Sequence, residues 1–541
     1  MSDQFTARTD ELPYQHQPAE TEVADARRRT MILVAMCTAL VAVTASVSGL
    51  NVAQQQLASD LGATQSQLLW VINGYTIALA ALLMPIGAIG DRFGRKHILL
   101  AGLGVFAVAN VLASLATSPA QLIAFRVLAG AGAAMIMPVT LSVITSTFPE
   151  AERGRAVGIW AGFAGGGGIL GLLSSAILVD NFTWPWLFVG PVALALVAAA
   201  FTVRFVPHSK EHSEGRFDVG GSLLSALAVG GLVLGIHEGP EVGWTSGVAL
   251  LGLLVGVASL IGFVVWERRQ QHPLLDVRVF SNRSLAAGSL GLTVSFAIIM
   301  GLFLVLVQFL QAVLGYSAVR AAVGLLPMIA VMMPLSAAAT GMAQRFGLRV
   351  MMTAGNIATA AGLVLLALMA SADGGYWPIL PGILLLGLGM GLSMSPGTAA
   401  ITASLPEEKQ GVASALNDTV REFGGAVGIA LIGSVLGAGY ASSVSGATAG
   451  LPAEAAAVVE EGIGGAFAIA PSLGEQGPAV LAAARTAFVD GWQFSMWLSA
   501  ALAIAAAVFT AVWIPRHRTA TSLVALDAPD STTTPELVAA G

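Results

Sequence analysis

The sequence predicts an all-α polytopic membrane protein with fourteen transmembrane helices. Apolar residues fill 56% of the 541 positions and charged residues only 10%, a composition typical of a chain whose mass lies mostly in lipid. Apolar runs of about 20 residues recur along the chain, and at a rise of about 1.5 Å per residue each can cross a hydrocarbon layer of about 30 Å. Basic residues fall in alternate connections between these runs. Together these three observations indicate a bundle of spanning helices.

The first six apolar runs are expected to form an N-terminal six-helix bundle over residues 31–206. The polar residues 1–30 before them lack the basic, apolar and small-residue order of a cleavable signal. They are therefore expected to be a disordered cytoplasmic tail, with the first span itself directing insertion. The six spans are predicted near residues 31–53, 68–90, 98–117, 121–147, 156–179 and 186–206.

The next two runs, near 220–238 and 245–266, are interpreted as a hairpin inserted between two repeated halves. With their flanking cytoplasmic loops they occupy residues 207–284. The last six spans are expected to form a C-terminal six-helix bundle over residues 285–514. They are predicted near residues 286–311, 318–343, 350–370, 378–401, 412–439 and 491–514.

Two stretches near the end of the chain are expected to lie outside the membrane. Residues 440–490, rich in Ala and Gly, form an extracellular segment that could be short helices on the membrane surface or a mobile loop, and both readings stay open. Residues 515–541 are expected to be a disordered cytoplasmic tail.

The basic residues predict the orientation. An even number of spans puts both chain ends on one side, and the side richer in Lys and Arg is the cytoplasm. Only Arg320 and Arg485 fall on the opposite face, so both tails are predicted to be cytoplasmic. The bases that follow the rule are Arg8, Arg27, Arg28, Arg29, Arg92, Arg95, Lys96, Arg153, Arg155, Arg204, Lys210, Arg216, Arg268, Arg269, Arg278, Arg283, Arg345, Arg349, Lys409, Arg516 and Arg518.

A charged turn, GAIGDRFGRK at residues 87–96, separates the second and third spans. RFGLR at 345–349 repeats its second half, with Gln344 standing where Asp91 stands. The turn resembles the loop between spans two and three of the major facilitator superfamily. The resemblance implies two six-helix bundles around a central site. Because Gln344 replaces the acid, the second copy at 345–349 is expected to keep the turn and to have lost its role as a conformational switch. The switch residues it implies are Gly87, Asp91, Arg92, Gly94, Arg95 and Lys96.

Further stretches resemble the fourteen-span drug:proton antiporters of that superfamily, relatives of the quaternary-ammonium and methyl viologen resistance exporters. They include IHEGPEVGW at 236–244, ERRQQHPLLDVRVF at 267–280 and NDTVREFGG at 417–425. The chain departs from the family pattern in two places. Span 5 lacks the Gly-Pro and Gly pair of the antiporter signature, and Ser46 stands where these exporters usually carry an Asp. Import and non-cationic substrates therefore stay open.

Four ionisable residues lie inside predicted spans and away from the span ends, at positions where each costs roughly 2.5 to 3.5 kcal/mol on insertion scales. Asp418 and Glu422 share one face of span 13, with Arg421 beside them. We expect Glu422 to gain and lose a proton during the cycle; the alternative is an ion-pair group that only neutralises itself. Arg126 in span 4 matches the family's arginine, for which the resemblance implies proton coupling; the alternative is a structural anchor.

The position of Asp91 suggests a latch. Span 13 begins near Gly411, and the partial positive charge at a helix N-terminus would attract a carboxylate lying opposite. Breaking that contact would accompany rocking of the halves. The simpler interpretation of Arg92 is that it follows the positive-inside rule. The candidate substrate-binding residues are Asn51, Asn73, Met137 and Gln308.

The function expected from the sequence is proton-coupled export of lipophilic, drug-like and in some cases cationic small molecules from the bacterial cytoplasm. The expected partners are this small-molecule substrate, protons and membrane lipid, with no nucleic acid, metal or cofactor, and we expect a monomer. No Walker motif is present, so ATP is not the expected energy source. The alternatives are a transporter of one defined metabolite or lipid-like solute and, more remotely, a membrane-embedded enzyme or scramblase.

Overall fold

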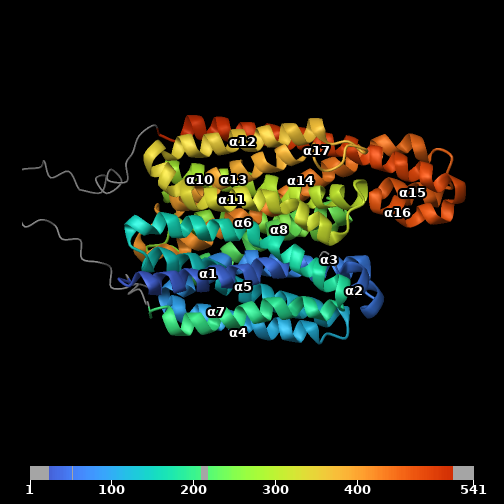
Figure 1. Cartoon of the computed structure of the whole chain (residues 1–541). Helices are drawn as coiled ribbons and strands as arrows, with labels where there is room; N and C mark the ends of the chain where they lie inside the picture. Colours follow the sequence, from blue (N-terminus) through green and yellow to red (C-terminus); the bar gives the residue numbers. More distant parts are fainter. Residues whose placement is uncertain (1–22, 51–52, 209–216, 516–541) are drawn as a thin grey trace, which may run out of the picture.

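The structure, a computed structural model, describes residues 23–50, 53–208 and 217–515 (Figure 1). Among these residues every regular element is a helix, and fourteen helices are long and apolar enough to cross a membrane. The predicted all-α, fourteen-span architecture is therefore confirmed. Asn51, the loop residues 209–216 and most of both predicted tails lie outside the described residues.

Six crossings come from the first part of the chain. Five are single helices, and the sixth starts with a 3₁₀ turn, η1, that continues into α7. A short helix that the sequence did not predict, α2 (Gln54–Leu61), connects the first two crossings. The crossings are α1 (Ala26–Gly49), α3 (Gln65–Phe93), α4 (Arg95–Ser114), α5 (Pro119–Thr147), α6 (Glu150–Asn181), and η1 (Trp184–Phe188) with α7 (Val189–Phe205).

The next two crossings form a hairpin, α8 (Val219–Val242) and α9 (Gly247–Glu267). Their closest approach is between Gly231, Gly235, Gly252 and Gly256, where an added Cβ would meet the facing backbone. Small residues let spanning helices pack this closely. The hairpin lies against α3 and α14, and a 3₁₀ turn, η2 (Val277–Ser281), follows it.

The remaining crossings come from the last part of the chain. The first ends in a π-helical turn, η3 (Phe309–Val313), and the fifth follows a 3₁₀ turn, η4 (Glu407–Lys409). They are α10 (Arg283–Gln308), α11 (Ala318–Phe346), α12 (Leu348–Met369), α13 (Leu380–Thr402), α14 (Gln410–Thr448) and α17 (Gly477–Trp513).

The segment 440–490 is largely helical, so of the two interpretations left open its secondary structure agrees with short helices. α14 and α17 run on past the length that a bilayer needs, and between them lie α15 (Ala453–Glu461), α16 (Ile463–Ile469) and the 3₁₀ turn η5 (Ala470–Gln476). These short helices form a cap at one end of the bundle (Figure 1). The cap is fastened by hydrogen bonds from Thr448 Oγ1 to Glu460 (2.6 Å) and from the Tyr440 hydroxyl to the Val459 carbonyl (3.0 Å).

Two glycine turns show the internal repeat. Gly94 joins α3 to α4 with φ of 100°, and Gly347 joins α11 to α12 with φ of 91°. A residue with a Cβ rarely adopts such a positive φ, which accounts for the Gly shared by RFGRK and RFGLR. The expectation that the second copy keeps the turn is confirmed.

Early and late helices meet most extensively along two pairs, α3 with α14 and α6 with α11, with smaller contacts of α5 with α14 and of α6 with α13. In the second pair, Ser336 Oγ donates a hydrogen bond of 2.9 Å to the Gly158 carbonyl. Gly87 and Gly411 bring the first pair together. Each contact involves the half of its helix nearest the Gly94 turn, so the helices are packed together at that end of the bundle.

Candidate functional site

The side chain of Asp91, in the last turn of α3, reaches the start of α14. The Gly411 N–H lies 2.9 Å from both Asp91 carboxylate oxygens, and the Val412 N–H donates to Oδ2 at 3.2 Å. These N–H groups belong to the first turn of α14, where no preceding carbonyl is available to accept them. The contact expected between Asp91 and the start of span 13 is present.

Glycine makes this contact possible. A Cβ added at Gly87 would lie 2.6 Å from both the Gly411 carbonyl and the Ala415 Cβ, and one added at Gly411 would lie 2.6 Å from Asp91 Oδ1. The two helices therefore approach backbone to backbone, which puts the helix N-terminus within reach of a side chain as short as Asp.

The bases of the turn have different environments. Arg95 is 1% exposed and its Nη2 lies 3.1 Å from Asp91 Oδ1, so it holds the carboxylate from the opposite side to α14. Lys96 Nζ donates to the Val203 and Val206 carbonyls, at 3.0 and 2.7 Å, which fastens α4 to the end of α7. Arg92 is partly exposed. Of these bases, Arg95 contacts the carboxylate and Lys96 serves packing.

About two turns further along α14, Asp418 and Arg421 form a buried pair. Arg421 Nη1 donates to Asp418 Oδ1 at 3.2 Å, and the Asn417 amide donates to the same oxygen at 3.2 Å. The two side chains are 0% and 5% exposed, yet Asp418 Oδ2 and Arg421 Nε have no hydrogen-bond partner among the described residues. The pair therefore neutralises its charges with part of its hydrogen-bonding capacity unused.

Glu422 differs from its neighbours. It is partly exposed, and its carboxylate makes no hydrogen bond or ion pair with any of the described residues. The Tyr75 phenol on α3 lies within electrostatic range of both Glu422 and Arg126. Glu422 can therefore exchange a proton without breaking a hydrogen bond, whereas protonation of Asp418 would disturb its contacts with Arg421 and Asn417.

Arg126, on α5, is the centre of a second buried polar group. Its Nε donates to the Val71 carbonyl at 3.1 Å, its Nη1 donates to Ser46 Oγ at 2.9 Å, and its guanidinium lies 4.2 Å from the centre of the Tyr75 ring. Ser46 also contacts Asn110 Oδ1 at 3.4 Å. The serine that replaces the family's usual acid thus faces Arg126, whose Nη2 has no partner among the described residues.

Sequence reasoning missed the aromatic residues of the site. The Arg421 guanidinium lies 5.3 Å from the Trp160 ring on α6 and 4.5 Å from the Phe296 ring on α10. Trp160 is fully buried and its Nε1 donates to Thr140 Oγ1 at 3.0 Å. The sequence carries no signal for this role, because Trp160 lies only four residues inside the predicted span 156–179, near the interface where tryptophan is enriched in any case.

The candidate substrate-binding residues are dispersed. Asn73 is 7% exposed on α3, two residues from Tyr75, and Met137 is 2% exposed in the core around α5. Gln308 is the last residue of α10, before the π-helical turn. Asn73 therefore shares α3 with Val71 and Tyr75, which contact Arg126, whereas Met137 and Gln308 lie on other helices.

Comparisons with known proteins agree with this architecture. A model of the Major Facilitator Superfamily matches residues 34–429. The methyl viologen resistance protein SmvA of Salmonella typhimurium is 32% identical over 486 residues, covering 90% of this chain and 97% of that protein. The multidrug efflux pump LfrA of Mycolicibacterium smegmatis is 33% identical over 458 residues, covering 84% and 90%. A tetracenomycin C resistance and export protein of Streptomyces glaucescens is 32% identical over 489 residues, covering 88% and 90%.

Solved structures share the fold. The human organic anion transporter MFSD10 aligns with a TM-score of 0.58 at 13% identity, over 90% of this chain and 99% of that one. A bacterial homologue of the lysosomal transporter Spinster, in an inward-facing unoccupied conformation, aligns with a TM-score of 0.54 at 18% identity, over 93% and 99%. With the family match over most of its length, the fourteen spans and the charged turn at Asp91, this chain belongs to the Major Facilitator Superfamily, a family of membrane transporters rather than enzymes.

Proposed function

We propose that this protein exports lipophilic, drug-like small molecules across a bacterial cytoplasmic membrane in exchange for protons, by alternating access. Relatives named for methyl viologen resistance, multidrug efflux and tetracenomycin export support the class of substrate. One observation carries the proton coupling. Glu422 makes no hydrogen bond or ion pair with any of the described residues, and it lies on α14 beside Asp418 and Arg421, which pair with each other. The Tyr75 phenol, whose ring contacts Arg126, lies within electrostatic range of Glu422.

In this proposal Glu422 carries the proton. Glu422 is partly exposed in this structure. In a conformation that buries it, an unpaired carboxylate would be costly, so binding of a proton to Glu422 would lower the free energy of that conformation. Arg126 and Arg421 keep their positive charge throughout the cycle because a guanidinium does not deprotonate in proteins. They therefore act as fixed charges that hold the negative form of the acid or an electron-rich group of the substrate.

The conformational part of the proposal assigns Asp91 as a latch between α3 and α14. Its hydrogen bonds to Gly411 and Val412 exist only while the two helices touch at this end of the bundle. Opening of the same end would break them and return the N–H groups to water. Asp91 would then select between two states of the transporter and take no part in binding substrate or proton.

The bases at the Asp91 end, with Arg320 and Arg485 at the other, support a cytoplasmic position for that end and for both termini. A proton moving inward through about 100 mV releases roughly 2.3 kcal/mol. This free energy sustains a substrate gradient of roughly fifty-fold per proton.

The test is uphill dye transport in proteoliposomes under an imposed pH gradient. Glu422→Gln keeps the shape of the side chain and removes its ability to titrate, so we expect gradient-driven accumulation to fall to the level of empty vesicles while the protein still inserts. Glu454→Gln, at an exposed carboxylate of the cap, is the matched control and should transport normally. Undiminished accumulation by Glu422→Gln would contradict the proposal.

The second candidate function is transport of one defined metabolite, with uptake as a variant. Ser46 favours it, because the site lacks the acid that usually faces this position and Arg126 Nη2 is left without a partner among the described residues. A solute with a hydrogen-bond acceptor would fill that position. A deletion strain that accumulates dyes no faster than its parent, yet retains one metabolite, would favour this candidate over drug export.

A further inference from the structure

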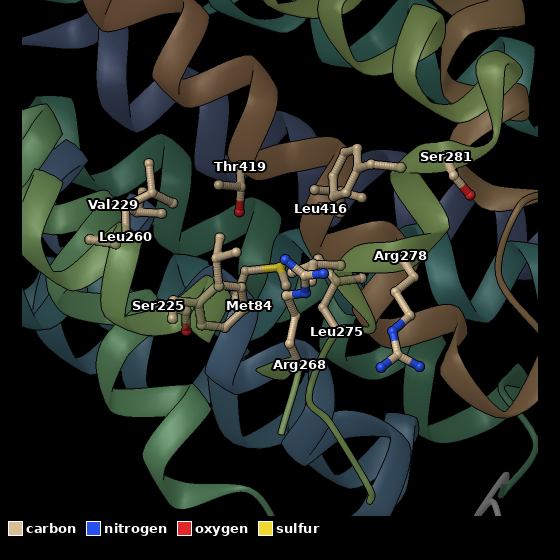
Figure 2. Close-up of a pocket in the computed structure, with 15 residues that line it drawn as sticks. Met84, Ser225, Val229, Leu260, Arg268, Leu275, Arg278, Ser281, Leu416 and Thr419 are labelled. Carbon is tan, nitrogen blue, oxygen red and sulfur yellow. The ribbon is translucent and has the colours of Figure 1, made fainter. Parts of the chain in front are cut away.

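A cavity of about 620 Å³ lies between the α8–α9 hairpin and the rest of the bundle (Figure 2). Most of its wall is apolar, with Met84 from α3, Phe263 from α9 and Leu416 from α14. Arg268 and Arg278, on the segment after α9, also line it. Its volume falls in the range of about 300 to 1,000 Å³ found for small-molecule sites.

The two arginines have no polar partner of their own. Both are exposed, and neither guanidinium makes a hydrogen bond or ion pair with any residue that the structure describes. In Figure 2 the Arg268 side chain rises from its loop into the middle of the labelled residues. Two unpaired cations beside an apolar cavity match an amphiphile with an anionic head and a hydrocarbon tail.

The segment that carries the arginines is held in place. The Leu275 N–H donates to Glu267 Oε2 at 3.3 Å, and Lys409 Nζ donates to the Pro273 carbonyl at 2.9 Å. Asp276 caps η2 through the Arg278 N–H at 3.0 Å. These contacts position both arginines beside the cavity without using their side chains.

The cavity is also accessible from the membrane side. Leu260 and Val264, which line it from α9, are 44% and 37% exposed although they belong to a spanning helix. Arg268 follows directly after the end of that helix, at the level where lysines and arginines meet lipid headgroups. A lipid in the adjacent leaflet could therefore place its phosphate and its chain in the cavity without leaving the bilayer.

We propose that this cavity binds an anionic phospholipid, with the phosphate on Arg268 and Arg278 and part of an acyl chain between Met84, Phe263 and Leu416. The proposal does not depend on the direction or energy source of transport. It has a consequence for the fold, because α3 and α14, which line the cavity, are also the helices that meet at Asp91 and Gly411. Lipid in the cavity stabilises their contact.

The experiment measures phosphatidylglycerol bound to the purified full-length protein by native mass spectrometry, during titration from a phosphatidylcholine background. A basic residue near an anionic lipid surface contributes about 1 kcal/mol, or about fivefold in affinity. The double variant Arg268→Gln/Arg278→Gln should therefore bind phosphatidylglycerol about thirtyfold more weakly. Arg269→Gln, an exposed arginine on the same segment that does not line the cavity, should bind it normally.

A second variant, Val229→Phe, fills the cavity and keeps both arginines, and it should weaken binding of the lipid as well. Unchanged binding by either the double variant or Val229→Phe would overturn the proposal. Glycerol phosphate binding as tightly as phosphatidylglycerol would show a phosphate site without a role for the chain, which also overturns it. So would displacement of the lipid by an equimolar transported dye, since the cavity would then be a substrate site.

Discussion

Asp91 is held from two directions. Arg95 contacts it within its own turn, and the first N–H groups of α14 contact it from the other half of the chain. A hydrogen bond to a charged group contributes about 1.5 to 3 kcal/mol to stability, and a charge at a helix N-terminus adds about 0.3 to 1 kcal/mol. These are large quantities for the equilibrium between the two conformations that the proposed alternating-access cycle requires.

We expect Asp91→Asn to shift the protein toward conformations that are open at the Asp91 end. Asn loses the charge and one of the two acceptor oxygens, so the closed state should lose about 1 to 3 kcal/mol. Distances between spin labels on the adjoining ends of α3 and α14 would report the shift. Gln344→Asn, at the equivalent position of the second repeat, is the control and should leave the distances unchanged. Unaltered distances in Asp91→Asn would contradict the latch.

Trp160 provides the second prediction at this scale. Its ring contacts the Arg421 guanidinium and its Nε1 donates to Thr140, so Trp160→Leu removes both interactions and leaves a cavity. We expect a loss of about 2 to 4 kcal/mol in stability, measured as thermal unfolding of the purified protein. Trp497→Leu, which removes a ring that is 47% exposed on α17, should have little effect. Equal losses in both variants would show that Trp160 is ordinary packing.

The sequence could identify the four intramembrane ionisable residues because charge in an apolar run is conspicuous. It could also place Asp91 opposite Gly411, because the sequence shows both the charged turn at residues 87–96 and the expected start of span 13 near Gly411. It could not identify Tyr75 or Trp160, because an aromatic side chain in a span looks the same whether it faces lipid or a cation. Their roles depend on tertiary contacts.

Glycines control the approach of the helices that meet between early and late parts of the chain. A side chain as small as methyl at Gly87 would overlap Ala415 and the Gly411 carbonyl. Overpacking of a tight contact costs about 1 to 3 kcal/mol, and at Gly87 the cost falls on the conformation in which α3 and α14 touch. The same substitution has no such cost in a conformation where they have separated.

We therefore expect Gly87→Ala to favour opening of the Asp91 end and to lower transport turnover, with normal amounts of protein in the membrane. Turnover per inserted protein, measured by dye efflux from vesicles, checks this. Gly104→Ala on α4 is the matched control, because a Cβ at Gly104 meets nothing within 4 Å. If the two alanine variants turned over equally, the close approach at Gly87 would have no part in the cycle.

Helix existence was predictable and helix length was less so. Apolar runs gave all fourteen crossings, since hydrocarbon thickness fixes their minimum length. The extensions of α14 to 39 residues and α17 to 37 residues were not predicted. Ala favours helix and Gly opposes it, so a segment rich in both carries little local signal, and the cap owes its helices to packing on these extensions.

At the scale of the whole molecule, the first helix starts and the last one ends at the same end of the bundle (Figure 1). The distribution of bases predicts that this end is cytoplasmic. We expect a fluorescent protein fused to the C-terminus to be fluorescent in cells, and alkaline phosphatase fused there to be inactive. An active phosphatase fusion would show that the C-terminus lies outside the cytoplasm. The directions proposed for proton and substrate movement would then be reversed.

The central claim is that movement of protons and of substrate is one coupled process through Glu422. The most direct test imposes a dye gradient on proteoliposomes at equal pH on both sides and records the internal pH. The account predicts that dye leaving the vesicles drives protons inward, that the pH change stops with the dye flux, and that Glu422→Gln abolishes it. Dye movement by the unmodified protein without any pH change would contradict the account.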